Sequence, residues 1–116
     1  MIAHIVLFRP RADLRSNERQ ALIDSFGEAL REIPSIRRAR VGKRLRTGRS
    51  YESSAREDYP YAAVLEFDDV TGLTAYLDHP SHARLAGRFG AACDAALMYD
   101  FDLREDAAEL PPEPVE

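Results

Sequence analysis

The chain begins with an almost entirely apolar run, Ile2 to Phe8, and this run restricts the folds open to everything after it. The β-branched residues Ile2, Ile5 and Val6 favour a strand, and the lack of polar alternation predicts a strand buried on both faces. A sheet that contains such a strand needs cover on both sides. A chain of 116 residues is the size of one domain and buries only a moderate share of its own surface.

A helix is expected after this strand, from about Asn17 to Glu32. Ser16 can cap its start and Pro34 ends it. Its apolar residues recur at spacings of three and four, which is typical of a helix with one buried side. These residues are Leu22, Ile23, Phe26, Ala29, Leu30 and Ile33.

Three further strands are expected at residues 36–46, 61–67 and 97–103. Apolar side chains alternate with period two in the first and the last of these, and Tyr61, Ala63, Leu65 and Phe67 share one face of the middle strand. Helical sequence fills the interval from about residue 68 to residue 96, and Pro80 divides it into two helices. The resulting order, β-α-β-β-α-β, is the split βαβ or ferredoxin-like arrangement. The predicted fold class is therefore α+β, with a four-stranded antiparallel sheet and helices on one face.

In this arrangement the first strand presents His4, Val6 and Phe8 to the helices and Ala3, Ile5 and Leu7 to the other face. The helix-free face is then too apolar to meet water. We expect it to pack against a second copy of the chain, as an isologous homodimer.

Composition excludes several classes of protein. A formal net charge of −4 argues against a general nucleic-acid binder, which is usually basic. The arginines between residues 37 and 49 could bind phosphate, but they also fit a charged edge strand.

No apolar run reaches the ~18 residues of a membrane span, and the start lacks the pattern of a signal peptide, so the cytoplasm is the expected location.

Two smaller features of the sequence bear on its chemistry and its domain limits. Cys93 is the single cysteine, which excludes an internal disulfide, and we expect it to be a small core residue on a helix. Residues 104–116 are acidic and contain three prolines, and we expect a disordered tail that follows a domain of residues 1–103.

The segment Tyr76-Leu77-Asp78-His79-Pro80-Ser81-His82 carries the candidate chemistry. On one straight helix Tyr76 and His82 would point well apart, but the helix break that Pro80 imposes allows them to converge. An imidazole can accept a proton near neutral pH, and a protonated phenol can donate a hydrogen bond to a developing oxyanion. Together they suit removal of a proton beside a carbonyl.

The same residues also fit purely structural roles. His79-Pro80 is an ordinary helix start, Tyr76 can be a core aromatic residue, and His82 a polar residue near a helix N-terminus. His4, in mid-strand, fits either a buried core histidine or a polar group on a pocket floor. Two histidines with Asp78 match no strong metal-binding pattern, so no metal site is predicted.

Several of these motifs together resemble the stress-responsive A/B barrel family of dimeric α/β-barrel proteins, over about residues 1–103. They are the opening strand, Ile33-Pro34, Val41-Gly42, Glu66-Phe67-Asp68, the Tyr76 to His82 segment and Asp100-Phe101. The resemblance implies a ferredoxin-like protomer whose sheets join in a homodimeric barrel.

The family includes plant stress proteins without settled activity and a plant polyketide cyclase that works by aldol condensation without a metal or organic cofactor. Its catalytic tyrosine and histidine match Tyr76 and His82 here, and its early-strand pocket histidine matches His4. Phe26, Ala63 and Cys93 depart from the pocket residues expected from the cyclase, so the substrate does not carry over.

We therefore expect an apolar pocket between sheet and helices that binds an apolar or carbonyl-bearing small molecule without a metal or cofactor. His82, Tyr76 and His4 are the candidate catalytic residues. The other candidate pocket residues are Val6, Phe8, Leu22, Phe26, Ala63, His79, Leu85 and Met98. The leading hypothesis is a polyketide cyclase-like enzyme, and the alternative is a non-catalytic stress-responsive protein that binds a ligand or a partner.

Overall fold

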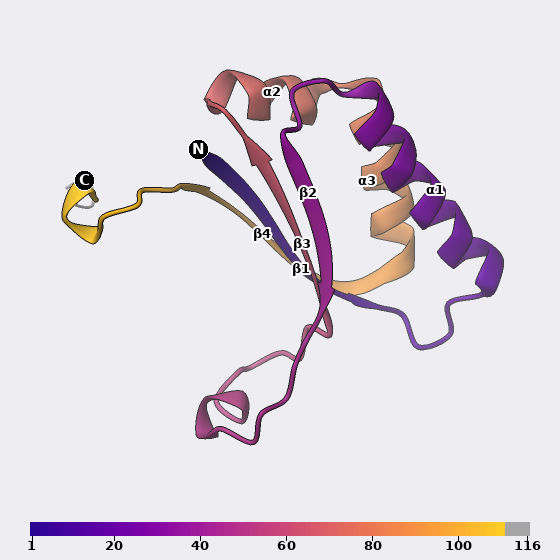
Figure 1. The fold of residues 1–116 in the computed structure, drawn as a ribbon. Helices are drawn as coiled ribbons and strands as arrows, with labels where there is room; N and C mark the ends of the chain where they lie inside the picture. Colours follow the sequence, from indigo (N-terminus) through magenta and orange to yellow (C-terminus); the bar gives the residue numbers. More distant parts are fainter. Residues whose placement is uncertain (111–116) are drawn as a thin grey trace, which may run out of the picture.

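A computed structural model describes residues 1–110. A four-stranded antiparallel sheet carries its helices on one face (Figure 1). The elements are β1 (Ile2–Pro10), α1 (Ser16–Glu32), β2 (Arg38–Lys43), β3 (Tyr61–Phe67), α2 (Val70–Asp78), α3 (Pro80–Ala92) and β4 (Cys93–Asp102). The sheet order is β2-β3-β1-β4, which confirms the predicted ferredoxin-like fold.

The register of the sheet decides which side chains share a face. His4 on β1 lies opposite Leu65 on β3 and Asp100 on β4. Val6 likewise lies between Ala63 and Met98. Directly opposed residues of antiparallel strands point to the same side of the sheet, so all of these face the helices.

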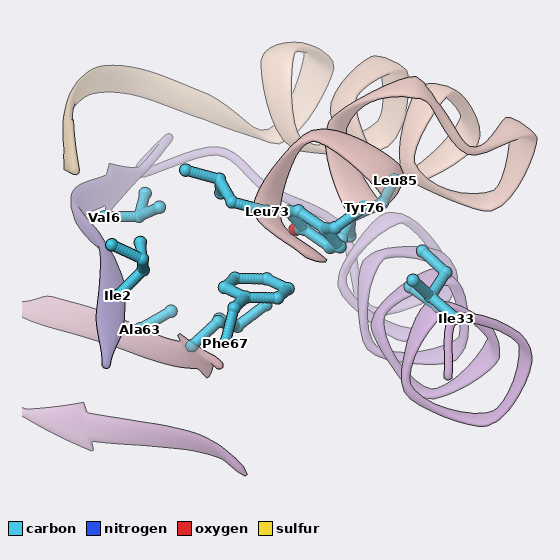
Figure 2. Packing of buried hydrophobic residues seen from close by; sticks show 10 residues of the cluster. Ile2, Val6, Ile33, Ala63, Phe67, Leu73, Tyr76 and Leu85 are labelled. Carbon is cyan, nitrogen blue, oxygen red and sulfur yellow. The ribbon is translucent and has the colours of Figure 1, made fainter. Parts of the chain in front are cut away.

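The core lies between this sheet face and the helices. Phe67, Leu65 and Ile33 are almost completely buried. Figure 2 shows Phe67 and Tyr76 between the strands and the helices, and their ring centroids are 5.4 Å apart. Burial of side chains this large supplies much of the free energy that holds the helices on the sheet.

The helix-free face remains apolar in the single chain. On β4, Leu97, Tyr99 and Phe101 alternate with residues that face the helices, and they are 39%, 55% and 48% exposed. Contiguous apolar exposure of this kind is typical of a surface that another protein covers.

Several boundaries differ from those predicted. The second strand is limited to Arg38–Lys43, α3 ends at Ala92 instead of near residue 96, and β4 starts at Cys93. Alanines at 91, 92, 95 and 96 favour helix by propensity, but pairing with the end of β1 draws residues 93–96 into the sheet. Cys93 is therefore a half-buried residue at the helix–strand junction, not a core residue on a helix.

The start of α1 also differs in detail, because the cap position is Arg15 instead of Ser16. The Glu18 carboxylate accepts a hydrogen bond from the Arg15 backbone N–H at 3.1 Å. It also forms an ion pair with the Arg11 guanidinium at 3.0 Å. A carboxylate in the first turn is also favoured by the helix dipole.

Of the acidic tail, residues 107–109 form a short 3-10 turn, and residues 111–116 lie outside the described part of the chain. The disordered tail over 104–116 stays a prediction. No helix within residues 1–110 is long and apolar enough to cross a lipid bilayer.

The buried position of Phe67 makes it a test of the core. Replacing Phe67 by Ala should lower the free energy of unfolding by about 3–5 kcal/mol, because it removes a ring and leaves a cavity. Chemical denaturation followed by circular dichroism measures this change. Leu45, which is 83% exposed, is the control, and Leu45→Ala should change stability by less than about 0.5 kcal/mol. Equal losses in the two variants would contradict this account of the core.

Candidate functional site

The helix break between α2 and α3 positions the site. The backbone of His79 is extended (φ −72°, ψ 141°), and His79 is both the C-cap of α2 and the N-cap of α3. Pro80 occupies the first helical position of α3, where its missing N–H costs nothing. The residue before a proline avoids helical dihedral angles, so the sequence itself imposes the turn.

Three polar contacts hold the start of α3 in place. The Ser81 backbone N–H donates to the His79 ring nitrogen Nδ1 at 3.0 Å. The buried Ser81 hydroxyl hydrogen-bonds the Glu32 carboxylate at the end of α1. Arg84 donates to Glu28 from Nε at 2.7 Å, which adds a second link between α3 and α1.

The break brings the Tyr76 and His82 rings together. Their centroids are 4.6 Å apart and their planes meet at 63°, an edge-to-face contact. Tyr76 is 3% exposed and His82 is half-buried. His4 lies on the other side of Tyr76, with ring centroids 5.7 Å apart. Tyr76 and His82 thus form one cluster of rings with His4, which is distant from both in the sequence.

Asp100, which the sequence indicated only as part of a family motif and not as a site residue, also belongs to this cluster. Its Oδ1 lies 2.6 Å from His4 Nδ1, and His4 is 7% exposed. The carboxylate favours a proton on Nδ1, so a neutral His4 presents Nε2 as an acceptor. The sequence could have indicated Asp100 through its position, a carboxylate among the alternating residues of the last strand. Only the strand register, however, places it beside His4.

Burial shifts the acid–base properties of the central pair in opposite directions. It raises the pKa of Tyr76 to about 12, so this hydroxyl stays protonated at neutral pH. It lowers the pKa of His82, and His4 adds to that effect, while the Leu77 backbone carbonyl opposes it. A neutral imidazole beside a protonated phenol is a base next to a hydrogen-bond donor.

The cluster lines a cavity of about 1070 Å³ between the sheet and the helices. A volume of this size suits a small organic ligand. The three candidate catalytic residues, His4, Tyr76 and His82, all line the cavity. Seven of the other predicted pocket residues also line it: Val6, Phe8, Leu22, Phe26, Ala63, Leu85 and Met98.

His79 is the predicted pocket residue that does not line this cavity. Its ring is committed to the cap of α3 through Ser81. Of the three departures from the cyclase pattern, Phe26 and Ala63 do line the cavity, whereas Cys93 does not. Within residues 1–110, no group of three or more His, Cys, Asp or Glu side chains could hold a metal ion.

Two arginines in the cavity wall were also missed. Arg11 and Arg19 lie where β1 gives way to α1, and both contribute to the lining. Their sequence signal is weak, because arginines near a helix N-terminus are common on protein surfaces. Only the packing of α1 over the sheet brings them to the cavity.

Comparison with solved structures supports the fold. A dimeric ferredoxin-like protein of unknown function from Thermobifida fusca has 24% identity, covers 88% of this chain and 90% of its own, and gives a TM-score of 0.67. A protein from Arabidopsis thaliana gives a TM-score of 0.75 at 17% identity, with 92% and 99% covered. Hydroxynitrile lyase from Passiflora edulis gives 0.74 at 20% identity, with 90% and 94% covered.

A search of curated protein sequences finds no match. The model of one protein family matches residues 2–103, nearly the whole of the ferredoxin-like unit, and its description is stress responsive A/B barrel domain. The chain therefore belongs to the stress responsive A/B barrel family.

Proposed function

We propose that this protein is a homodimeric small-molecule enzyme that closes a ring in a polyketide-like carbonyl compound by an aldol-type step, without a cofactor. The observation that carries the proposal is the contact of Tyr76 with His82 in the wall of a mostly apolar cavity. The plant cyclase resemblance supports the same pair, because the catalytic tyrosine and histidine of that enzyme match Tyr76 and His82.

In the proposed step, His82 accepts a proton from a carbon between two carbonyl groups. The Tyr76 hydroxyl donates a hydrogen bond to the enolate oxygen that forms. The enolate carbon then bonds to a second carbonyl carbon of the same molecule, and the resulting alkoxide takes the proton back from His82. His4, held by Asp100, positions the ligand or the His82 ring.

Two features of the cavity and one comparison support this chemistry. The Tyr76 hydroxyl makes no hydrogen bond within residues 1–110, so its donor is available to a ligand. The lowered pKa of His82 keeps it neutral, as a base must be. One similar structure is named as a hydroxynitrile lyase, so a relative of this fold carries an enzyme's name.

The dimer is the second part of the proposal. The apolar residues Leu97, Tyr99 and Phe101 on the helix-free face would be covered by the same face of a second copy. Several similar solved structures are described as dimeric, which supports this arrangement.

Substitution of the central pair tests the reaction. Tyr76→Phe and His82→Ala should each lower turnover of a linear poly-β-keto thioester by at least ~10²-fold, because each removes one proton-transfer or oxyanion contact. Ring-closed product above the enzyme-free background is measured by mass spectrometry. Tyr51, which is 69% exposed and outside the cavity, is the matched control, and Tyr51→Phe should keep full turnover.

The outcome also separates the enzyme from a binding protein. If both Tyr76→Phe and His82→Ala turn over the thioester at the wild-type rate, the assigned roles are wrong. If the wild type binds the compound without converting it and these variants only weaken binding, the protein is a non-catalytic binder.

The His82 environment predicts a titration. Its ring should titrate with a midpoint below the ordinary value of ~6.5, because burial disfavours the charged imidazolium. Activity that depends on neutral His82 should therefore be lost only as the pH falls through this lowered pKa. NMR titration of the ring protons measures the midpoint, with the His82→Ala spectrum for assignment. A midpoint above ~6.5 would contradict the prediction.

The helix-free face predicts the assembly state. Wild-type protein should have twice the chain mass of 13.1 kDa by light scattering, and Phe101→Asp should shift it toward the single-chain mass. A carboxylate buried in an apolar interface is strongly unfavourable. Val70→Asp, at an apolar residue on α2 that is 63% exposed, should leave the dimer intact. A dimer that survives Phe101→Asp would place the interface elsewhere.

A further inference from the structure

Apart from Tyr61, the polar side chains of the cavity are divided between its two ends. His4, Tyr76, His82 and Asp100 form the histidine end, whereas Arg11 and Arg19 form the arginine end. The strand β1 runs from one end to the other, from His4 to Pro10, and the six steps between these residues span ~20 Å. The cavity is therefore long enough to separate two different parts of one ligand.

Chain direction explains why the two arginines share an end. After β1 the chain turns back into α1, so the first turns of α1, with Arg19, lie near the end of β1 (Figure 1). The end of α3 reaches the same place, because the Arg11 backbone N–H donates to the Ala92 carbonyl at 2.8 Å. Phe26 and Leu85 lie on the same two helices nearer the histidine end.

The two arginines differ in the ion pairs and hydrogen bonds that they form within the chain. Arg11 pairs with Glu18 at 3.0 Å and with Asp13 at 3.2 Å, and it also donates to the Ala91 carbonyl. Arg19 is exposed, and its guanidinium makes no ion pair or hydrogen bond with any residue in the range 1–110. Arg19 thus offers an uncompensated positive charge and its donors at the rim of an apolar cavity.

The walls between the two ends have no charged group. They are built from Val6, Phe8, Leu22, Phe26, Ala63, Leu85 and Phe89. At the histidine end the Asp100 carboxylate adds a negative charge, which disfavours an anion there. Charge and apolar surface together define an orientation for an amphiphilic molecule.

We propose that the cavity takes an amphiphile with an apolar body and one anionic oxygen group, a carboxylate or a phosphate, and that Arg19 binds this group. A guanidinium suits both groups, because its donors can meet two oxygens at once. The proposal rests on the proposed function in that the same cavity holds the reacting molecule. It adds a direction: the anion lies at the arginine end, and the reacting carbonyls lie at the histidine end.

Binding of three matched probes tests the proposal without any turnover. Decanoate, decyl phosphate and decanol share one apolar chain and differ in the head group. By titration calorimetry at low salt, wild-type protein should bind at least one of the two anions about 3- to 10-fold more tightly than decanol. The anion whose affinity exceeds that of decanol by the larger factor shows whether the site prefers a carboxylate or a phosphate.

The variants assign the preference to one side chain. Arg19→Gln should remove the preference for the anion and leave decanol affinity unchanged, and Arg19→Lys should restore part of it. Arg31→Gln is the matched control, because Arg31 lies on the same helix but outside the cavity lining. It should keep the full preference.

Equal affinity for all three probes, no binding of any of them, or an anion preference that survives Arg19→Gln would overturn the proposal. These results are independent of the chemistry at the other end. Tyr76→Phe and His82→Ala should keep the anion preference, so a failed reaction with an intact preference would count only against the proposed enzyme.

Discussion

The constraint on which the rest of the structure depends is that β1, in the middle of the sheet, is apolar on both faces. This strand lies between β3 and β4, so both of its edges are paired. Its helix side carries His4, Val6 and Phe8 along the floor of the cavity, and its other side carries apolar residues to the helix-free face. One strand thus connects the candidate site to the surface proposed for dimerisation.

The second requirement is a helix that ends and restarts within a single residue. Tyr76 belongs to α2 and His82 to α3, and the extended backbone of His79 changes the chain direction between them. Without that change the two rings would lie on different sides of one helix. The contacts of Ser81 with Glu32 and of Arg84 with Glu28 hold the new direction against α1. The geometry of the site is therefore supported by polar contacts outside the cavity.

The cavity itself exists because large side chains lie at its edges and smaller ones along parts of its floor. Ala63 lies opposite Val6 on the sheet, and the helices above contribute Phe26 and Phe89. Apolar walls with polar groups confined to the ends are typical of sites that bind small organic molecules. The same low polarity shifts the pKa values of Tyr76 and His82, because charged forms are poorly solvated there.

The sequence alone determined the fold class, the faces of β1 and the helix break, since each of these follows from local periodicity or from a proline. It also indicated most of the residues that line the cavity. Tertiary structure decided the rest. The pairing of β4 with β1 set the end of α3 and brought Asp100 to His4, and the packing of α1 brought Arg11 and Arg19 to the cavity rim. These contacts join residues that lie far apart in the chain. They are created by strand register and helix packing, which no local sequence pattern encodes.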